Sequence, residues 1–329
     1  MRRIAVNGAI LHRGLSGIAR MTTYLIDALG GLPDIDVRVV SPVRPRSRSS
    51  VVNALQDTWW DLRGAEHHAR AADLLVSPCN LGRATRIPNL LCVADIMPIE
   101  HPEYFDRKFA AYFRALLPYS LRRASRVMTN TEHVRRKLLQ IAPKADVHVV
   151  PLPSGRTPRV AVPFPDRTKD VLVVGATAPH KNQSAAVNAV DLLRQRTGED
   201  VRLHIVGPPG HAEHALAAQI GRLDREGRWI TRHVAITDEA LERLYASAWI
   251  LVQPSIDEGY GLPLVEAAEH GLPAVHSGAG AMSEVAPLGN ARGTDAASLL
   301  SAMAPLLERS AWKQHAVGVR EIADRKSVV

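Results

Sequence analysis

The chain of 329 residues is poor in cysteine and has no long hydrophobic run. Its two cysteines, Cys79 and Cys92, lack the CxxC spacing of a zinc site and are too few for a disulfide framework. No apolar stretch approaches the ~20 residues that span a membrane, and Asn7 and His12 interrupt the stretch that a secretion signal would need. We therefore expect a soluble protein of the reducing cytoplasm, with a peripheral place on the inner face of the membrane as the alternative.

Aromatic and acidic residues are also scarce. Phe, Trp and Tyr make up 5% of the chain, and its 33 acidic residues are outnumbered by 41 lysines and arginines, which gives a net charge of +8. A positive protein favours anionic partners, although an Arg- and Ala-rich composition also follows from genomic base composition. No helix-turn-helix, zinc finger or aromatic RNA-binding strand accompanies the charge, so we expect no nucleic-acid partner. Nucleotides and acidic lipids remain.

A regular alternation of two patterns runs along the chain. Short apolar runs bounded by turn residues alternate with longer segments whose apolar residues recur every three or four positions, which indicates α/β architecture with mostly parallel sheets. The predicted strands cover 3–9, 36–41, 73–78, 90–95, 126–130 and 147–151 in the first half, and 170–176, 201–207, 232–236, 249–255 and 273–277 in the second. The predicted helices include 17–29 and 105–124 in the first half and cover about 182–196, 211–226, 237–247 and 262–270 in the second.

A proline-studded segment separates the two halves of this pattern. Residues 156–170 read RTPRVAVPFPDRTKD, which suits neither a helix nor a central strand. The length also favours two domains, because single cores stop growing near ~250–300 residues. We therefore predict two doubly wound, Rossmann-like domains, 1–155 and 156–329, that face a central cleft, where ligands of such proteins usually bind.

Residues 257–273, DEGYGLPLVEAAEHGLP, carry the clearest local signal. An apolar strand leads through a turn into a helix that has Pro263 in its first turn and Gly271 at its end. The first N–H groups of a helix carry partial positive charge, and Gly259 and Gly261 would let a ligand approach the backbone closely. This arrangement predicts a site for phosphate groups.

Two glutamates flank the predicted phosphate site. Glu258 lies in the turn, and Glu266 lies about one turn into the helix. A carboxylate beside a phosphate is unfavourable unless it accepts hydrogen bonds from hydroxyl groups of the same ligand. A sugar nucleotide has hydroxyls on both sides of its diphosphate, so Glu258 would bind the sugar and Glu266 the ribose. The alternative is that Glu258 is an exposed turn carboxylate and Glu266 a partner of the helix dipole.

The residues around these glutamates resemble a known family. The stretch DEGYGLPLVEAAEHGLPAVHS is similar to the E-x7-E region of family 4 glycosyltransferases, whose usual form is EGFGLP-x-LEA-x-x-x-G-x-P-V. The flanking runs ITDEALERLYASAWILVQPS and SGAGAMSEVAP, and the earlier DVLVVGATAPHKNQSAAVNAV and RLHIVGPPG, resemble the nucleotide domain of the same family. In the first half, GLSGIARMTTYLIDAL, VHVVPLPSG and the long stretch from DIMPIEHPEYFDRKF to TEHVRRKLL resemble its mannosyltransferase B-like branch.

The resemblance implies the GT-B fold and roles for individual residues. The first domain, 1–155, would bind the acceptor, and the second, 156–329, the nucleotide sugar. The implied catalytic residues are Glu258, Lys181 and Asp95, with Lys181 neutralising charge on the leaving diphosphate; the alternative for Lys181 is a surface lysine in a first helical turn. The implied nucleotide-sugar-binding residues are Glu266, Gly259, Tyr260, Gly261, Leu262, Gly17, Gly175 and His180, with Gly14 beside Gly17 in an N-terminal glycine loop. The resemblance implies no metal and no cofactor other than the donor substrate.

The chain departs from the family pattern at three places. The usual His-Asp pair stands here as Ala94 and Asp95, and the missing histidine lies near the transferred sugar in relatives, so we expect altered turnover or donor choice. His101 is a candidate substitute for it. The arginine that is common near His180 is missing, with Ala176 in the preceding loop. Finally, RKSVV stops where the family continues into a crossover helix, so we expect that helix to be absent or truncated.

We therefore expect a retaining glycosyltransferase that moves a hexose, with mannose as the first candidate, from a GDP- or UDP-sugar to a hydroxyl group. The acceptor would be a glycan, a lipid-linked saccharide or a small molecule such as a secondary metabolite. The alternative is a catalytically impaired subunit that binds nucleotide sugars as a scaffold, and a sugar-nucleotide epimerase of the same fold is a more remote one. An anionic membrane surface is a further candidate partner, facing the basic residues Arg114, Arg122, Arg123 and Arg126.

Overall fold

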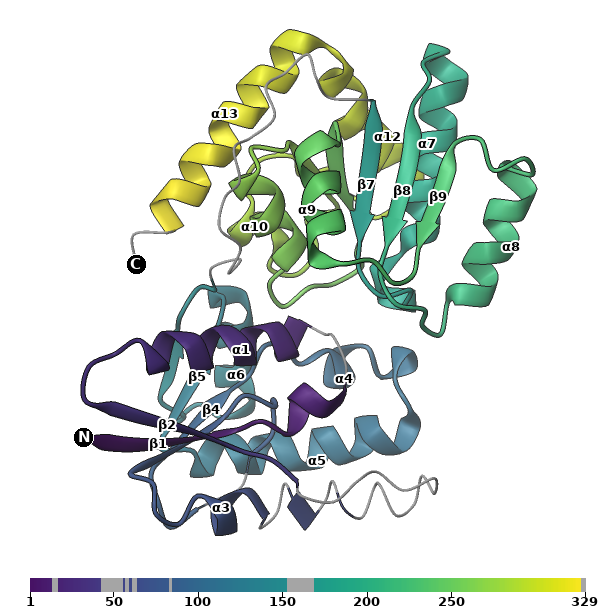
Figure 1. The fold of residues 1–329 in the computed structure, drawn as a ribbon. Helices are drawn as coiled ribbons and strands as arrows, with labels where there is room; N and C mark the ends of the chain where they lie inside the picture. Colours follow the sequence, from purple (N-terminus) through teal and green to yellow (C-terminus); the bar gives the residue numbers. More distant parts are fainter. Residues whose placement is uncertain are drawn as a thin grey trace. The chain divides into compact units, whose positions relative to one another are not determined.

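The computed structural model describes residues 1–13, 17–42, 56, 59–60, 64–82, 85–152 and 169–326. The chain divides into two compact units, Met1–Leu152 and Pro153–Val329, and each is built around one parallel sheet (Figure 1). The sequence predicts the division after residue 155. The predicted linker lies, up to residue 168, outside the described residues.

Six parallel strands form the sheet of the first unit, in the order β2-β1-β3-β4-β5-β6. The strands are β1 (Arg2–Asn7), β2 (Ile35–Val40), β3 (Leu74–Ser77), β4 (Asn89–Cys92), β5 (Arg126–Thr129) and β6 (Val147–Val149). The helices are η1 (Ala9–Arg13), α1 (Gly17–Gly30), α3 (Ala65–His68), α4 (Met97–Glu100), η3 (Pro102–Tyr104), α5 (Arg107–Arg123) and α6 (Glu132–Ile141).

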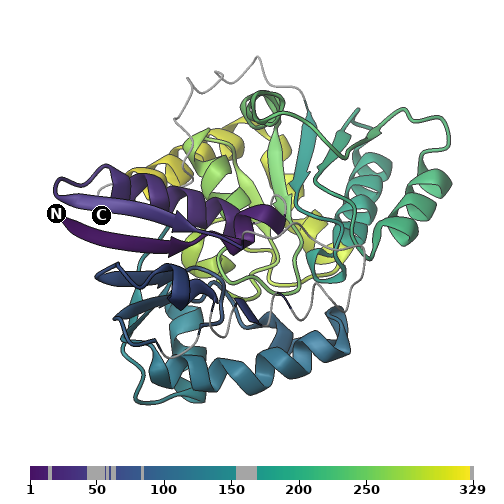
Figure 2. The same cartoon turned by 60° about the horizontal axis from the view of Figure 1, so that its bottom comes forward.

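Helices cover both faces of the first sheet because successive side chains of a strand point to opposite sides. Leu91 and Val127 belong to a buried cluster with side chains of α5 and α6. Their neighbours Cys92 and Met128 pack instead with Met21 of α1. Figures 1 and 2 show α1 and α5 on opposite sides of this sheet.

Five parallel strands form the sheet of the second unit, in the order β11-β10-β7-β8-β9. The strands are β7 (Asp170–Val174), β8 (Arg202–Val206), β9 (Ile230–His233), β10 (Ile250–Gln253) and β11 (Ala274–His276). The helices are η4 (Pro179–Lys181), α7 (Gln183–Thr197), α8 (Glu213–Leu223), α9 (Asp238–Ser247), α10 (Leu262–Glu269), α11 (Met282–Val285), α12 (Ala296–Met303), η5 (Ala304–Leu307) and α13 (Arg309–Lys326).

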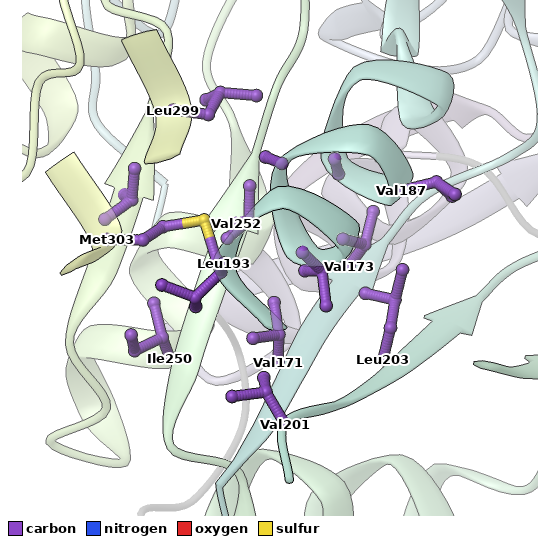
Figure 3. Close-up of a cluster of buried hydrophobic side chains, with 14 of the residues drawn as sticks. Val171, Val173, Val187, Leu193, Val201, Leu203, Ile250, Val252, Leu299 and Met303 are labelled. Carbon is purple, nitrogen blue, oxygen red and sulfur yellow. The ribbon is translucent and has the colours of Figure 1, made fainter. Parts of the chain in front are cut away.

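The core of the second unit lies between its sheet and the helices α7 and α12. Val171 and Val173, two residues apart on β7, point to the same face and pack against these helices. Figure 3 shows the cluster, whose labelled members also include Val187, Leu193, Val201, Leu203, Ile250, Val252, Leu299 and Met303.

Two buried tryptophans join α13 to the amino end of β10. The indole Nε1 of Trp312 donates to the carbonyl O of Trp249 at 2.7 Å, and the Nε1 of Trp249 donates to the carbonyl O of Leu306 at 2.8 Å. The two ring systems also contact each other, with their centroids 5.7 Å apart. The last described helix is therefore part of the second unit.

The predicted strands are confirmed, with one shift. The sequence predicts a strand at 232–236, but β9 spans Ile230–His233. The carboxylate of Asp224 accepts the N–H groups of Trp229 and Ile230, both buried, and so fixes where the strand begins. Val234, apolar but 48% exposed, lies beyond its end.

Two longer helices, α12 and α13, lie outside the helices predicted for the second half. α12 and α13 follow the last strand of their unit, where the alternation of strand and helix no longer guides a prediction. Among the described residues, no helix is both long and apolar enough to cross a membrane.

Candidate functional site

The strand order of the second sheet marks where a ligand would bind. From β7 the chain runs outward through β8 and β9, then returns to the other side of β7 with β10 and β11. In open parallel α/β sheets, ligands bind beyond the carboxyl ends of the strands at such a reversal of order. The segments that follow β7 and β10 carry Lys181 and Glu258 to this place.

Asn182, whose backbone adopts the left-handed conformation, holds the loop of Lys181 in position. Lys181 ends η4, and the next residue, Asn182, has a φ of 49°, a conformation that asparagine adopts more readily than most residues. Its Nδ2 donates to the carbonyl O of Pro254 at 3.1 Å and to that of Thr294 at 2.8 Å. The segment after β7 is thereby tied to the segment after β10.

Lys181 and Glu258 form an ion pair, with 2.6 Å between Nζ and Oε1. The same Oε1 accepts hydrogen bonds from Gln253 Nε2 at 2.7 Å and from Ser255 Oγ at 2.8 Å. All three residues are buried, with Glu258 8% exposed, Gln253 1% and Ser255 0%. A buried carboxylate is stable only when it is paired and hydrogen-bonded, and both conditions are met here.

The surroundings of Glu258 keep it ionised. Burial by itself would raise the pKa of Glu258, because it removes water from the charged form. The charge of Lys181 and the hydrogen bonds from Lys181 and Ser255 outweigh burial, and His180 acts in the same direction, so the pKa of Glu258 lies below its ordinary value. At neutral pH this side chain can accept hydrogen bonds but cannot donate a proton.

The turn after Glu258 brings the chain to the start of α10. Gly261 has a φ of 87°, which side chains disfavour, and directly precedes Leu262, the first helical residue. Among the described residues, no acceptor receives the N–H of Gly261 or of Leu262. A Cβ at Gly280 would lie 2.2 Å from Asp257 Oδ1, so close packing by another loop fixes the turn.

Glu266 is directed into the protein toward α9. Its side chain is only 1% exposed, and its Oε2 accepts the phenol hydroxyl of Tyr245 at 2.5 Å. The Tyr245 ring stacks on His270, with 5.3 Å between centroids, and His270 Nε2 lies 2.7 Å from Glu242 Oε2. Side chains of α9 and α10 therefore hold Glu266 in one orientation. That it binds a ribose stays a prediction.

Two glycines allow the loops after β7 and β8 to pack backbone to backbone. Gly207 has a φ of 148°, and a Cβ there would lie 2.1 Å from the carbonyl O of Gly175. A Cβ on Gly175 would in turn meet the side chain of Lys181 at 3.7 Å, an ordinary contact distance. Gly175 thus lies directly beside the lysine, and its role in binding a nucleotide sugar stays a prediction.

The other predicted residues of the second unit lie along the same loops. His180 precedes Lys181, and its carbonyl O accepts the N–H of Ile256 at 2.8 Å. Gly259 and Tyr260 complete the turn between Glu258 and α10, and the Tyr260 side chain is buried. The structure therefore gathers Lys181, His180, Gly175, Glu258, Gly259, Tyr260, Gly261 and Leu262 at one edge of the second sheet.

An arginine that the sequence pattern does not single out reaches the loop after Gly175. Arg232 of β9 donates through its guanidinium to Thr177 Oγ1 at 2.8 Å and forms an ion pair with Glu213 at 2.9 Å. The hydrogen bond from Arg232 lowers the pKa of Glu213. A guanidinium group thus lies beside the loop that follows Gly175, although its charge is balanced by Glu213.

Asp95 belongs to the first unit, where it follows β4. Its Oδ1 accepts the N–H of Met97 at 3.1 Å and so shapes the entry into α4. The N–H of Ala94, the residue that replaces the expected histidine, donates to Asn80 Oδ1 at 2.7 Å. These bonds are local, and a catalytic role of Asp95 stays a prediction.

Gly17 and His101 also lie in the first unit. Gly17 is the exposed first residue of α1, and Gly14 lies outside the described residues. His101 Nδ1 lies 3.3 Å from Glu103 Oε1, and its ring stacks on Tyr104 with 5.6 Å between centroids. These contacts occupy His101 at the surface, and its use as a substitute for the missing histidine stays a hypothesis.

The residues that hold the two glutamates are not predicted from the sequence. Gln253 and Ser255 stand at the carboxyl end of a fully buried strand, and polar residues at such a strand end are a signal that could have been used. Tyr245 carries no comparable signal, because a tyrosine at the end of an amphipathic helix is most simply explained as core packing.

The family model matches residues of the second unit. Residues 168–321 match the family model described as Glycosyl transferases group 1. The chain is 29% identical over 203 residues to O-antigen chain mannosyltransferase B of Escherichia coli, covering 58% of this chain and 53% of that protein. It is 32% identical over 184 residues to the MMP alpha-(1->4)-mannosyltransferase of Mycolicibacterium hassiacum, covering 55% and 41%. The matched part thus spans about half the length of these relatives.

A solved structure extends the likeness to the whole chain. Sucrose-phosphate synthase from Thermosynechococcus elongatus superposes with a TM-score of 0.76 at 15% identity, covering 99% of this chain and 94% of that one. At this identity the likeness concerns the fold. Residues 168–321 are therefore similar to a glycosyl transferases group 1 domain, in a chain with the two-sheet parallel α/β fold of GT-B glycosyltransferases.

Proposed function

We propose that this protein is a retaining glycosyltransferase that transfers a hexose from a nucleoside diphosphate sugar to a hydroxyl group of its acceptor. The observation that carries the proposal is the ion pair of Lys181 and Glu258 at the reversal point of the second sheet. There a cation for phosphate and a carboxylate for sugar hydroxyls lie side by side, beside a helix start that offers N–H groups.

The donor would lie along the segments after β7 and β10. Lys181 and the N–H groups of Gly261 and Leu262 would bind the diphosphate, since these donors all suit an anion. Glu258 would accept hydroxyls of the transferred hexose, and Glu266 those of the ribose. On binding, Lys181 exchanges part of its contact with Glu258 for the phosphate.

In the proposed reaction, charged and polar groups that are already in position would stabilise the transition state. The bond from the sugar C1 to the leaving phosphate oxygen breaks while the acceptor oxygen bonds to C1 from the same face. The proton of the acceptor hydroxyl passes to the leaving phosphate, whose growing negative charge Lys181 and the helix N–H groups stabilise. Glu258, held ionised, favours the positive charge that develops on the sugar ring.

The names of the relatives support mannose as the sugar. Both curated relatives compared above are mannosyltransferases by name, one of them of an O-antigen chain. GDP-mannose is therefore the first donor to test and UDP-sugars the second. A glycan or lipid-linked saccharide is the first acceptor, with a small molecule as the alternative.

The exposed face of α5 supports a peripheral place on an anionic membrane. Five cations on this helix are exposed: Arg107, Lys108, Arg114, Arg122 and Arg123. Phe109 and Tyr119 are 42% and 38% exposed on the same helix, and aromatic rings favour the boundary between water and lipid. A lipid-linked acceptor would be reached most easily from this position.

A non-catalytic scaffold that binds nucleotide sugars is the second candidate, because Ala94 stands where the family has a histidine. The expected result for an enzyme is hydrolysis or transfer of the sugar, and binding without turnover across donors and acceptors would favour the scaffold. Replacing Ala94 with histidine should then restore measurable turnover.

Isothermal titration with GDP, UDP, GDP-mannose and UDP-glucose, together with a donor-hydrolysis assay, tests the proposal. We expect Glu266→Gln to weaken binding of the nucleotide and Glu258→Gln to lower turnover. Glu226→Gln, which changes an exposed acid of the same unit that pairs with Arg228, is the matched control. Wild-type binding and turnover in both site variants would refute these assignments.

A further inference from the structure

Glu258 is held by a closed set of hydrogen bonds that the proposed chemistry does not explain. Gln253 Nε2 carries two hydrogens, and it donates one to Glu258 Oε1 at 2.7 Å and the other to Ser255 Oγ at 3.0 Å. Ser255 Oγ donates its own hydrogen to the same Oε1 at 2.8 Å. The three side chains therefore form a triangle in which every hydrogen has one acceptor.

Both donors of this triangle are fixed by the fold. Gln253 is the last residue of β10 and is 1% exposed, and Ser255 is fully buried. The carbonyl O of Ser255 accepts the hydroxyl of Ser277, which follows β11, at 2.6 Å. Because two adjacent strands anchor the donors, the position of Oε1 depends on the sheet and not on the loop that carries Glu258.

The two oxygens of Glu258 have different surroundings. Oε1 receives all three donors, including Lys181. Oε2 meets no donor among the described residues, and the Glu258 side chain keeps 9% of its surface exposed. A freely rotating carboxylate would share its donors between both oxygens, so this division is a consequence of the triangle.

Packing alone does not account for Gln253. Its Oε1 is buried and has no hydrogen-bond partner among the described residues, which is unfavourable for a carbonyl oxygen. The residues before it on β10, Ile250, Leu251 and Val252, are all apolar, and an apolar side chain would fill the position without that defect. The amide is explained by what its Nε2 does for Glu258.

We propose that Gln253 and Ser255 are positioning residues that hold Glu258 Oε1 against the protein and leave Oε2 to accept a hydroxyl group of the donor's hexose. This proposal rests on the function proposed above. It assigns the preference for a nucleotide sugar over the bare nucleoside diphosphate to residues on β10 and just after it, outside the two-glutamate motif.

Gln253→Met and Ser255→Ala test the proposal, because each removes a donor and retains most of the side-chain volume. The matched control is Gln219→Met. Gln219 of α8 is also buried, and its Nε2 also donates twice, to Ser184 O at 3.1 Å and to Asn188 Oδ1 at 2.7 Å. Thermal unfolding identifies variants that are merely less stable, and Ser255→Ala is the smaller change if Gln253→Met does not fold.

Two measurements separate positioning from general support. The first is the ratio of the dissociation constants for GDP and GDP-mannose, which we expect to fall about tenfold in both variants while the affinity for GDP itself stays near that of wild type. The second is an NMR titration of the Glu258 carboxyl carbon in the ligand-free protein. Loss of the Ser255 hydrogen bond should raise the pKa of Glu258, and loss of the Gln253 donor should act in the same direction, because a hydrogen bond to a carboxylate favours its charged form. Gln219→Met should change neither.

The outcomes also distinguish this proposal from the proposed function. If Glu258→Gln abolishes the preference for GDP-mannose while Gln253→Met and Ser255→Ala retain it, and their Glu258 titrates as in wild type, the positioning role is refuted and the function stands. If wild type shows no preference for GDP-mannose over GDP, the assignment of Glu258 to the sugar fails, and this proposal fails with it.

Discussion

The carboxyl edges of the two sheets are built from different side chains. In the second unit, Lys181 and Glu258 meet as ions beyond strands β7 and β10. In the first unit, Asn7 Oδ1 accepts the indole N–H of Trp60 at 2.8 Å, and Asn130 Nδ2 donates to Val150 O at 3.0 Å. These two amides of the first edge close its own loops, whereas the second edge holds an ion pair. Similar topology does not imply similar chemistry.

Removing the cation of the second edge, Lys181, should have the largest effect on turnover and stability. Lys181→Ala should lower turnover about a hundredfold or more, because the leaving phosphate loses its counter-charge. It should also reduce the free energy of unfolding by about 3 kcal/mol, since Glu258 stays buried without its partner. Steady-state kinetics and chemical denaturation measure both. Lys169→Ala, which removes a lysine paired with Glu199 at the other end of β7, should leave turnover unchanged.

Removing positive charge from α5 of the first unit should weaken binding to anionic membranes and leave turnover unchanged. Removing Arg122 and Arg123 together should weaken binding to vesicles of phosphatidylglycerol about thirtyfold, at about 1 kcal/mol for each cation. Co-sedimentation with vesicles measures the effect, and turnover with a soluble acceptor should stay constant. Arg222→Ala with Arg225→Ala in the second unit gives the same change in net charge. Equal losses for the two pairs would contradict a role for α5.

The support behind Glu266 should matter less than the ion pair. Tyr245→Phe removes the hydroxyl that donates to Glu266 and keeps the ring stacked on His270. We expect affinity for GDP to fall about tenfold with little change in turnover at saturating donor. Titration calorimetry is the measurement, with Tyr119→Phe in the first unit as the control. An unchanged affinity would mean that Glu266 is held without Tyr245.

The smallest expected effect is on stability against pH. The groups near Glu258 are Lys181, His180 and Asp257, and the pKa of Glu258 is depressed in the folded state. A depressed carboxylate stabilises the fold above its unfolded pKa, and that contribution is lost as the pH falls through the folded pKa. The difference in the free energy of unfolding between wild type and Glu258→Gln should therefore shrink as the pH falls below 4.5, the ordinary pKa of a glutamate. The loss should be about 1.4 kcal/mol for each unit by which the pKa of Glu258 is depressed. Denaturation at several pH values measures it.

The sequence predicts well what depends on local pattern. The strands and the helix after the two-glutamate turn follow from apolar periodicity and from Pro263 and Gly271, which act within a few residues. The turn that the sequence predicts before this helix is also present, and Gly261 has a φ of 87° in it.

What the sequence does not predict depends on distance along the chain. Lys181 and Glu258 are 77 positions apart, and only the order of strands β7 and β10 in the sheet brings them together. Tyr245 and Glu266 are 21 positions apart on two helices, and their contact depends on how those helices pack. Apolar periodicity fixes which face of an element is buried, but not which polar groups meet there.

The paired indoles of Trp249 and Trp312 should report on ligand binding through their fluorescence. Trp249 directly precedes β10 and is held there by Trp312, and Gln253 is the last residue of the same strand, four positions after Trp249. Both rings are buried against one another, so their light emission depends on how tightly the amino end of β10 is enclosed. If a ligand at the carboxyl end of β10 loosens the packing around these two tryptophans at its amino end, the intrinsic tryptophan fluorescence should therefore shift to longer wavelength. No dye or label is needed to detect this shift.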